Sequence, residues 1–582
     1  MRLKHRLSLG IDFSTVLPDN LSGQRSASSE QKKPARCNLH AERCTLNAEL
    51  AEPLVSVLLP TFNRPLYLAQ ALDSIVRQNY RKIQIIVAND GGCDVAGIVE
   101  QFNDRRIVFI NRKENRGLPF TLNEALRKAR GKYVCYLGDD DIYYPEHVST
   151  LVNALESHSP GAPGYLAAYS DLYKVYCKVN PDQSRMVYSK VVEVSRDFDP
   201  FLMLYFNNVL HVSLMHRRDL LEKTGLYNEK LNVMIDWDMT RRLAFFTDFL
   251  HVHQITGEYY HPAGECDRIS VQQRKDKQEY ARNVLTIRTT RPAKPWTKFA
   301  DLSIIFLTEN FNRNAGTTIG LIWQHTFYPY KLYIPLPDDV IGRFKTDMPN
   351  VVTVSVAPAA TQLQQIEKTL AQCEGQYIAV VPAGFPVRDM WVEDSLYALI
   401  NSQNNREAFE LEHSTSQCRA VVARREHIEL ACKEYPRLQL YEGLMAGGIK
   451  IRRITPEEIP FQFDTLLKVG RTEQNNGNLK QAAKIYVHIA NRYQNQLWMK
   501  SLAAQALFKA GDFHEAAELV SSVNGQRPTV DTLLLEAKLR RKGQNFESAL
   551  TLLNKAHKIL LGTSTELIGG VNPALQMQRT TK

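Results

Sequence analysis

Three consecutive aspartates, Asp139, Asp140 and Asp141, follow a short apolar run at 133–137 that is typical of a buried strand. Adjacent carboxylates raise one another's pKa unless a cation or strong hydrogen-bond donors compensate. A solvated turn would explain the triplet, and so would a divalent metal site, because Mg²⁺ and Mn²⁺ prefer oxygen ligands. The rest of the sequence has to decide between these two interpretations.

Polar side chains also occur at the ends of two other apolar runs. They are Thr61, Asn63 and Arg64 after the run at 55–59, and Asn89 and Asp90 within the segment 82–92. We expect Pro60 to end the first of these strands, because proline cannot donate a ladder hydrogen bond. Three polar strand ends are therefore available to build one site.

Alternating strands and helices must position these side chains. Nearly continuous apolar runs, typical of a parallel sheet buried on both faces, alternate with segments of helical periodicity. The helical segment at 65–79 places Leu68, Leu72, Ile75 and Val76 on one face. This order predicts a right-handed, doubly wound α/β layer, in which ligands bind at the carboxyl ends of the strands. We therefore expect the polar strand ends to meet in one crevice.

The sequence resembles a family 2 glycosyltransferase of the GT-A fold over roughly residues 53–290. The similarity lies in three segments in this order: VSVLLPTFNRPLYLAQALDSIVRQNYRKIQIIVANDGG from Val55, NRGLPFTLNEALRKARGKYVCYLGDDDIYYPEH from Asn115, and EKTGLYNEKLNVMIDWDMTRRLA from Glu222. The resemblance implies transfer of a sugar from a nucleotide-diphosphate sugar, with inversion of the anomeric centre. It also implies a divalent metal cofactor, Mn²⁺ or Mg²⁺, which stabilises the departing diphosphate as a Lewis acid.

The resemblance assigns the metal to the aspartate triplet, with Asp139 and Asp141 as an Asp-x-Asp motif. One carboxylate would hold the metal and the other the donor's ribose or a metal-bound water, with Asp140 as a further donor contact. Many relatives begin the motif one residue earlier, where this chain has Gly138, so the choice between Asp140 and Asp141 as main ligand stays open. His261 is a further candidate for a metal or phosphate contact, although a lone histidine is more often structural.

The same resemblance assigns the nucleotide to the other strand ends. The residues that match nucleotide-binding positions are Thr61, Asn63, Arg64, Asn115 and Gly117. Asp90 matches the aspartate that accepts a hydrogen bond from a uracil-like base, while Asn89 replaces a second acid common in relatives. Leu122 stands where many relatives have an arginine, so phosphate contacts on that side are unassigned. Arg64 would equally suit a solvated surface position.

Single-displacement chemistry also needs a base that takes the proton of the acceptor hydroxyl. Asp236 matches the family's catalytic aspartate, where relatives usually read Glu-Asp and this chain reads Ile235-Asp236. Asp238 is the neighbouring candidate for the same role. Because a helix follows, Asp236 would also suit a helix N-cap.

The second half of the chain contains an apparent copy of the first. LSIIFLTENFNR from Leu302 is similar to VSVLLPTFNR from Val55, and GQYIAVVPAGFPV from Gly375 to GKYVCYLGDDDIYYP from Gly131. The blocks are similarly spaced in both copies, which suggests a duplicated fold. Residues 383–385, Ala-Gly-Phe, replace the aspartates and cannot hold a divalent cation. We therefore predict a degenerate, non-catalytic GT-A-like domain at 300–458; an unrelated α/β domain is the alternative.

The C-terminal part has a different period. Gly477, Gly511 and Gly543 recur at intervals of 34 and 32 residues, with Ala482, Ala516 and Ala549 in step. Glycines between helices and small residues where helices cross resemble tetratricopeptide repeats. We expect about three helical pairs at 463–562, all α, which would bind a protein or peptide, cap the preceding domain or mediate self-association. Residues 1–51 and 563–582 are expected to be a flexible leader and tail.

Composition limits the remaining choices. The net charge of +10 is spread along the chain, which permits an anionic partner but is weak evidence for nucleic acid. Nine cysteines without repeated spacing fit reduced thiols. No apolar run of about 18 residues is present, and the N-terminus lacks the apolar core of a secretory signal. We expect a cytoplasmic protein without a transmembrane segment, with peripheral contact to the inner face of the membrane allowed.

The sequence thus predicts a catalytic GT-A domain at 52–295, a degenerate second domain and a helical-repeat tail. The predicted acceptor is a hydroxyl of a surface glycan, lipopolysaccharide or polysaccharide intermediate, or of a protein. One alternative is a nucleotidyltransferase of related fold, although such enzymes usually carry a Gly-rich phosphate loop where this chain has PTFNRP. The other is an interaction scaffold whose transferase domain is inactive.

Overall fold

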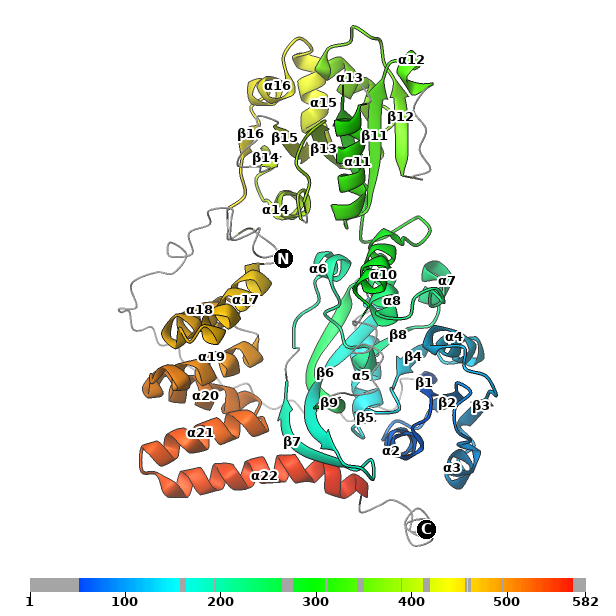
Figure 1. Ribbon diagram of the computed structural model, residues 1–582, viewed down its shortest axis with the longest axis vertical. Coiled ribbons are helices and arrows are strands. Elements are labelled where there is room, and N and C mark those ends of the chain that lie inside the picture. The colour runs from blue at the N-terminus through cyan, green and yellow to red at the C-terminus, as the bar shows by residue number, and fades with distance from the viewer. Residues whose placement is uncertain are drawn as a thin grey trace, which may run out of the picture.

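The fold is that of a computed structural model, which describes residues 52–157, 164–192, 195–263, 276–308, 312–342, 350–388, 390–411, 419–455, 458, 462–493 and 496–568. The predicted leader at 1–51 and residues 569–582 of the predicted tail lie outside these ranges. Figure 1 shows two sheet domains along the long axis of the molecule and a stack of helices beside the first of them.

The first sheet has nine strands. Its order is β3 (Ile107–Asn111), β2 (Ile83–Asn89), β1 (Val55–Thr61), β4 (Tyr133–Tyr136), β8 (Leu214–Arg217), β6 (Ala167–Val179), β9 (Phe249–Pro262) and β5 (Ile142–Tyr143), with β7 (Arg185–Val191) paired to β6. The first four strands run parallel. The helices that join them are α2 (Pro65–Val76), α3 (Ala96–Gln101) and α4 (Leu118–Lys128), and α5 (His147–Glu156) follows β5. The predicted doubly wound layer is confirmed.

Both faces of β1 are buried, which explains its unbroken apolar run. Val55, Val57 and Leu59 belong to the core on the side of α2, whereas Leu58 belongs to the core on the opposite side. Complete burial of such a side chain contributes about 1.5–3 kcal/mol. On α2 the predicted face is buried, apart from Val76, which is only partly covered at the end of the helix.

Pro60 does not end β1, contrary to our expectation. The strand continues to Thr61, and Pro60 pairs with Ala88 of β2. On the other side of β1, the paired residues of β4 reach only to Leu58, opposite Tyr136. Pro60 therefore lies where β1 has a single neighbouring strand, and its missing N–H interrupts no ladder on the other side.

The second sheet repeats the strand order of the first. It runs β12 (Val351–Ser355), β11 (Tyr330–Leu336), β10 (Leu302–Leu307), β13 (Tyr377–Pro382), β15 (Ala420–Arg424), β14 (Glu407–Leu411) and β16 (Lys450–Arg452). Four parallel strands are again followed by two antiparallel pairings and one parallel pairing, as at β4, β8, β6 and β9. This shared topology supports the interpretation of a duplicated fold.

One close contact recurs in both sheets. A Cβ atom on Gly131 would lie 2.5 Å from the backbone nitrogen of Ser56, and one on Gly375 would lie 3.1 Å from that of Ser303. In each copy the serine hydroxyl accepts a hydrogen bond from the glycine N–H, over 2.9 Å and 3.3 Å respectively. The same glycine thus lets the fourth strand start against the first strand in both copies.

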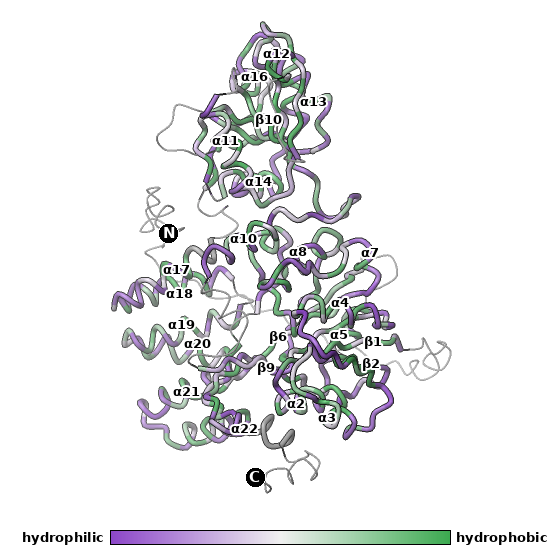
Figure 2. The backbone as a smooth tube through the Cα atoms, turned by 45° about the vertical axis from the view of Figure 1, so that its right-hand side comes forward, coloured by the Kyte–Doolittle hydropathy of each residue, from purple (hydrophilic) through white to green (hydrophobic). Residues whose placement is uncertain are grey.

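Three helical pairs form the C-terminal part, as predicted. They are α17 (Gln462–Asn475) with α18 (Leu479–Arg492), α19 (Leu497–Ala510) with α20 (Phe513–Gln526), and α21 (Val530–Lys542) with α22 (Phe546–Ile568). The three recurring glycines lie in the turns within the pairs, and the recurring alanines are at most 6% exposed. The last helix continues to Ile568, beyond the predicted end of the repeats at 562. Figure 2 shows hydrophobic residues interleaved with hydrophilic ones along these helices.

The repeats dock on the first sheet domain through β6 and β7. Arg527, which follows α20, forms an ion pair with Asp171 of β6 and donates to the Ser195 hydroxyl. The Ser189 hydroxyl of β7 donates to the Asp531 carboxylate of α21 over 3.2 Å. Asp171 is 1% exposed, so this contact is part of the protein interior.

The described residues also show the state of the cysteines and whether a helix could cross a membrane. The cysteines with free thiols among the described residues are Cys93, Cys135, Cys177, Cys373 and Cys432. In the described ranges, no helix combines the length and the apolar character needed to cross a membrane.

Candidate active site

The ends of β1, β2 and β4 are joined by hydrogen bonds at one edge of the first sheet. The backbone N–H of Asp90 donates to the carbonyl oxygen of Thr61 over 2.9 Å. The Thr61 hydroxyl in turn donates to Asp139 Oδ2 over 2.8 Å. The predicted convergence of three polar strand ends is therefore present in the structure, and Thr61 lies at its centre.

Two glycines after β2 allow the neighbouring loops to approach closely. Gly91 has a φ of +71°, and a Cβ atom there would lie 2.2 Å from the backbone carbon of Glu114. A Cβ atom on Gly92 would lie 2.7 Å from the backbone nitrogen of Asn63. Asn63, itself at a φ of 58°, accepts a hydrogen bond from the Cys93 N–H through Oδ1. The loops after β1, β2 and β3 thus pack directly on one another.

Asp139 anchors the loop after β1. Its Oδ2 atom accepts from the Thr61 hydroxyl and, over 3.4 Å, from the Phe62 N–H. Its Oδ1 atom lies 3.1 Å from Arg64 Nη1. Burial is the main reason that the pKa of Asp139 rises to about 6, and the charge of Asp140 adds to it. Both carboxylate oxygens accept hydrogen bonds within this chain, so Asp139 anchors the loop after β1, and its role as a metal ligand stays a prediction.

Arg64 provides positive charge at the aspartate triplet. Its Nη1 atom contacts Asp139 Oδ1 at 3.1 Å and Asp140 Oδ2 at 3.0 Å. The guanidinium therefore compensates part of the repulsion between adjacent carboxylates. Arg64 belongs to the site and is not a solvated surface side chain.

Asp141 is fixed from β9. Its Oδ1 atom accepts a hydrogen bond from the Tyr260 N–H over 3.0 Å. The next residues, Ile142 and Tyr143, form β5 and pair with β9. On β9, Glu258 accepts hydrogen bonds from the hydroxyls of Tyr144 and Tyr260. It also forms an ion pair with a fully buried lysine, Lys190. The strand that holds Asp141 is thus itself held by a buried polar network.

The triplet fits a hard divalent ion by the chemistry of its donors. Three carboxylates stand at one strand end, and a guanidinium supplies cationic charge among them. Asp140 has the most exposed carboxylate of the triplet, with 19% of its side chain accessible, and Asp141 is oriented by β9. The triplet therefore offers oxygen ligands suited to Mn²⁺ or Mg²⁺, and the predicted pair of Asp139 and Asp141 stays a prediction, with Asp140 as the more exposed alternative.

His261 lies on β9 beside Tyr260 but is not gathered with the triplet. Its ring packs edge-on against Tyr176, with 5.3 Å between ring centroids. Among the described residues, Asp139, Asp141 and His261 do not form a cluster of three metal-ligand atoms. A contact from His261 to a metal or phosphate stays a prediction.

Asp90 is buried and oriented by positive groups. Its Oδ1 atom accepts from Arg112 Nη2 over 2.7 Å and from the Arg116 N–H over 2.9 Å. In the part of the chain that the structure describes, Oδ2 has no hydrogen-bond partner. The neighbouring Asn89 side chain is used internally, since it bonds to Cys93 and Asn111. Asp90 Oδ2 is therefore left for a further contact, and a nucleobase there stays a prediction.

The loop after β3 holds the predicted Asn115 and Gly117. Asn115 Oδ1 accepts from the Gly117 N–H over 3.2 Å, and Gly117, at a φ of +86°, precedes α4. Sequence reasoning missed two arginines here: Arg112, which pairs with Asp90, and Arg116, whose guanidinium lies 3.6 Å from the centroid of the Phe120 ring. The run NRKENRG was the available signal, because it places three basic residues after a strand.

Asp236 lies in the first turn of α8 (Ile235–Leu243). The residue before the helix, Met234, has a left-handed φ of 57°, a costly conformation for this residue type. Asp236 Oδ2 accepts from Asn207 Nδ2 over 2.8 Å, and no N-cap bond is present at this helix. Burial raises the pKa of Asp236 above its ordinary value. A carboxylate with a raised pKa suits a general base better than a helix cap.

Asp238, predicted as a second catalytic candidate, has a structural position. It is 1% exposed, and its Oδ2 atom accepts from Arg242 Nε and Nη2 over 3.1 Å and 2.7 Å. Arg242 also donates to the carbonyl oxygens of Thr224 and Gly225. This buried ion pair fixes α8 on the preceding turn, and a catalytic role of Asp238 stays a prediction.

Asp236 and the triplet share a group of buried aromatic side chains. Asp236 lies near enough to Tyr227 to raise the pKa of its hydroxyl, although burial is the larger cause. Tyr227 packs edge-on against Tyr136, at 6.1 Å between centroids, and Tyr136 ends β4 just before the triplet. The candidate base and the carboxylates therefore lie on either side of one aromatic cluster.

A further arginine near the triplet was also missed. The Arg185 guanidinium lies between two tyrosine rings, 3.9 Å from the centroid of Tyr67 and 4.0 Å from that of Tyr260. Tyr260 thus contacts this cation through its ring and Asp141 through its backbone N–H. No motif marks Arg185 in the sequence, since β7 comes from a distant part of the chain.

In the second sheet, the turn after β13, which is equivalent to the aspartate triplet, has no carboxylate. Residues 383–385 follow β13, and Phe385 there is 1% exposed. The Gly384 N–H donates to the Thr318 hydroxyl over 3.1 Å. Phe311, part of the predicted repeat of the first loop, lies outside the described residues, while Asn312 caps α11 (Arg313–His325). Asp339, expected opposite Asp90, lies in α12 (Asp338–Ile341).

Comparisons with known proteins agree on the family of the first domain. The family profile described as Glycosyl transferase family 2 matches residues 56–176. An uncharacterized glycosyltransferase of Rickettsia prowazekii (strain Madrid E) is 32% identical over 215 residues, which are 36% of this chain and 64% of that protein. The PGL/p-HBAD biosynthesis glycosyltransferase of Mycobacterium tuberculosis (strain ATCC 25177 / H37Ra) is 26% identical over 212 residues, 35% of this chain and 76% of that protein.

Solved structures give weaker likenesses. The structure of S. aureus TarS 1-349 in complex with UDP has 17% sequence identity and a TM-score of 0.32, over 40% of this chain and 64% of that one. The chain spans 64% and 62% of the lengths of the first two curated relatives, so these similarities concern a part of each protein. The family match covers residues 56–176, which include Asp90 and the aspartate triplet.

Proposed function

We propose that this chain is a metal-dependent, inverting glycosyltransferase that moves a sugar from a nucleotide-diphosphate sugar to a hydroxyl acceptor. The observation that supports this most is the aspartate triplet. It is held by Thr61, Arg64 and Tyr260 at the edge where three strands end. Such an edge is the usual ligand site of a doubly wound sheet.

The donor would bind across the ends of β1, β2 and β4. Asp90 Oδ2 would accept a hydrogen bond from the imino N–H of a uracil-like base, because Oδ1 is already held by Arg112 and Arg116. We therefore propose a UDP-linked donor. Arg64, Arg112 and Arg185 place positive charge around the predicted diphosphate position, which favours an anionic ligand.

Asp140 and Asp141 would hold Mn²⁺ or Mg²⁺ against the diphosphate. When bound, the ion supplies Lewis-acid stabilisation of the negative charge on the leaving group. Asp139 keeps the loop after β1 in place through Thr61 and Arg64. The buried network around Glu258 orients Asp141 through β9.

Asp236 would act as the base. Its Oδ2 atom is oriented by Asn207, and its raised pKa favours uptake of the acceptor's hydroxyl proton. The deprotonated oxygen attacks the anomeric carbon while the bond to the diphosphate breaks on the opposite side. One displacement of this kind inverts the anomeric centre.

For the acceptor we propose a hydroxyl of a glycan, such as a polysaccharide or lipopolysaccharide intermediate. A protein acceptor is the second candidate, and a pocket of about 290 Å³ between the repeats and the first domain favours it. Trp498, Arg527 and Asp531 line the pocket from the repeats, and Tyr176 lines it from β6. Tyr176 touches His261, the neighbour of Tyr260, which connects the pocket to the metal motif.

A donor screen tests the proposed function. The full chain is incubated with UDP-, GDP- and TDP-linked sugars and Mn²⁺, and release of nucleoside diphosphate is measured. We expect release with one nucleotide class, loss on chelation with EDTA and recovery with added Mn²⁺. Asp141→Asn should lower the rate by about 10²- to 10³-fold, as for removal of a group that stabilises transition-state charge.

His514→Asn is the matched control, because His514 is an exposed side chain on α20. It should release diphosphate at the wild-type rate. Equal rates in the wild type and in Asp141→Asn, or no release from any donor, would contradict the proposal and favour the scaffold alternative. Release of inorganic pyrophosphate with formation of a nucleotide sugar would instead indicate a nucleotidyltransferase.

A further inference from the structure

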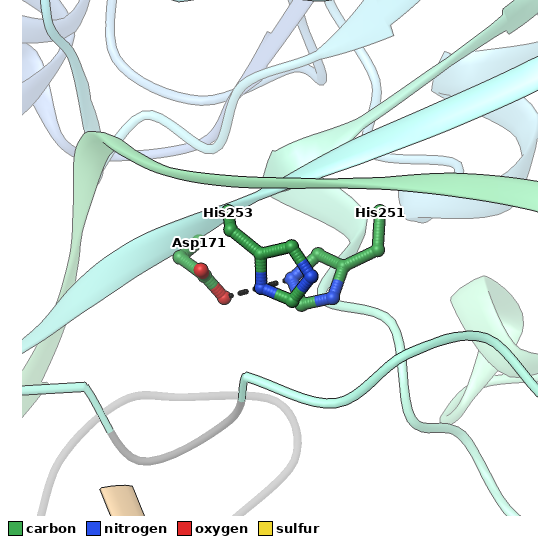
Figure 3. Close-up of side chains that lie close together, drawn as sticks. All are labelled: Asp171, His251 and His253. Carbon is green, nitrogen blue, oxygen red and sulfur yellow. Dashed lines mark hydrogen bonds and ion pairs between the residues drawn. The ribbon is translucent and has the colours of Figure 1, made fainter. Parts of the chain in front are cut away.

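A second group of ligand-type side chains lies on β6 and β9, apart from the triplet. Among the described residues, Asp171, His251 and His253 bring one ligand atom each within 4.8 Å of one another. His251 and His253 alternate along β9 and share a face, with 4.0 Å between their ring centroids. Figure 3 shows the three side chains turned toward a common point.

The pairing of β6 with β9 determines the relative positions of these three side chains. Tyr169 of β6 pairs with His251 of β9, and a register shift after Ser170 places Asp171 opposite Ile255. Tyr169 also stacks on the His251 ring at 4.6 Å, with the planes 2° apart. Side chains that project from neighbouring strands of a sheet are held more closely than side chains on loops. The group is therefore preorganised.

Asp197 orients both imidazole rings from outside the group. Its Oδ1 atom lies 2.9 Å from His251 Nδ1 and 3.0 Å from His253 Nε2. A hydrogen bond from Nδ1–H of His251 to a carboxylate directs the Nε2 lone pair away from it. This carboxylate–histidine arrangement is the one that commonly fixes a metal-binding imidazole.

His251 Nε2 then faces a second carboxylate oxygen. It lies 3.1 Å from Asp171 Oδ1, so two acceptors oppose each other unless a proton or a cation lies between them. The other oxygen, Asp171 Oδ2, is taken by Arg527 from the repeats. The side of the group that faces His253 is open, since 48% of the His253 side chain is exposed.

We propose that Asp171, His251 and His253 bind a divalent transition-metal ion of the Zn²⁺ type, with Asp197 orienting the two rings. Zinc binds imidazole nitrogen and carboxylate oxygen at about 2.0–2.2 Å, so donors 3.1 Å apart can share one ion. Two nitrogens and one oxygen favour Zn²⁺ over Mg²⁺ or Mn²⁺, which prefer oxygen. The site is thus chemically distinct from the aspartate triplet.

The position of this site implies a structural effect. The ion would join β6 to β9, and Asp171 would pass this restraint to the repeats through Arg527. A ligand that binds only the folded state raises its stability in proportion to the logarithm of its concentration over Kd. Zn²⁺ should therefore raise the Tm of the full chain.

Calorimetric titration tests the proposal on the tag-free full chain. The protein is stripped with EDTA, the chelator is removed, and ZnCl₂ is added with excess Mg²⁺ present to occupy the oxygen site. We expect one equivalent of Zn²⁺ in the wild type. His253→Asn should weaken binding at least tenfold and remove the rise in Tm, with an unchanged circular dichroism spectrum because His253 is half exposed.

His514→Asn is the matched exposed-histidine control and should bind Zn²⁺ like the wild type. Replacing Zn²⁺ with Co²⁺ gives a second readout, because Co²⁺ bound to nitrogen ligands should absorb visible light. The His253→Asn variant should lack this absorption. Equal Zn²⁺ affinity in the wild type and His253→Asn, or no stoichiometric binding, would overturn the proposal. Asp171, His251 and Asp197 would then form an ion-pair network only.

Discussion

At the scale of single residues, similar aspartates have different roles because of their neighbours. Asp238 is neutralised by Arg242 inside α8, whereas Asp236, two residues earlier, has the uncharged Asn207 as its partner. A buried carboxylate without a cation holds its proton more tightly, which is the cause of its raised pKa. The pairing, and not the residue type, distinguishes the candidate base from the structural acid.

Asp236→Asn tests the role of the base. We expect a loss in kcat of about 10²- to 10⁴-fold, because the base is removed while its shape is kept. In the wild type, activity should fall as the pH is lowered through the pKa of Asp236, since the protonated acid cannot accept the hydroxyl proton. A pH–rate profile of the wild type and a rate for the variant provide the measurement.

Stability gives an independent check on the same residue. A pKa that is higher in the folded state contributes stability below the unfolded pKa, and this contribution is lost as pH rises through the folded pKa. Asp236→Asn should therefore become more stable relative to the wild type as the pH rises. A variant that loses stability equally at all pH values would point to a purely structural role.

At the scale of elements, the site depends on turns that let loops approach closely. Gly91 and Gly92 bring the β2 loop against those after β3 and β1, respectively. The short strand β5 then ties the triplet to β9, where the buried Glu258 pairs with Lys190 of β7. The parallel strands provide the edge of the site, and the turns determine the distances across it.

Gly91→Ala tests this dependence on close loops. The new Cβ would lie 2.2 Å from the Glu114 backbone and would need a positive φ, so we expect a loss of about 1–3 kcal/mol. Nucleotide affinity should fall as well, because the Asp90 loop must shift. Denaturant unfolding and nucleotide titration measure the two effects.

The control for this substitution lies a few residues away. Gly97, in α3, would place a Cβ with no atom within 4 Å. Gly97→Ala should therefore leave nucleotide affinity unchanged and stabilise the chain by about 0.5–1 kcal/mol. Equal effects of both substitutions would show that the close approach at Gly91 is not needed.

At the scale of the whole molecule, the second sheet repeats the strand order of the first without an aspartate triplet at the equivalent turn. Both sheets share one strand order, yet the edge after β13 carries a buried phenylalanine, Phe385, where the first sheet has carboxylates. A strand end of this kind can be built without charge, so the aspartates of the first copy are explained by chemistry. The helical repeats contact the first sheet domain, which carries the aspartate triplet.

Trp498→Ala tests whether the repeats take part in acceptor binding. The substitution removes an aromatic wall of the pocket between α19 and β6, so we expect about a tenfold lower kcat/KM for the acceptor, equivalent to about 1.4 kcal/mol. Donor hydrolysis in the absence of acceptor should not change. Phe546→Ala, at an exposed aromatic outside the pocket lining, is the control.

Opposite results would separate the two acceptor candidates. If Trp498→Ala lowers transfer to a protein but not to a glycan, the pocket serves the protein acceptor. If it changes neither, the repeats have no role in acceptor binding.

The sequence by itself determined the layers, the second sheet and the helical repeats of this protein. Apolar periodicity, recurring glycines and the order of polar strand ends are local properties, and the first sheet, the second sheet and the helical pairs all follow them. It also located Asp90, the triplet and Asp236. The prediction that Pro60 ends β1 was wrong only about the length of that strand.

Only the tertiary structure decided how the charges are paired. Three ion pairs between side chains show this: Arg64 with Asp139, Arg112 with Asp90, and Arg242 with Asp238. In the first two pairs the residues are more than 20 positions apart in the sequence. Strand pairing likewise brought Asp171 to His251, which are 80 residues apart. The physical reason is that burial and distance set the energy of a charge, and neither is known until the chain has folded.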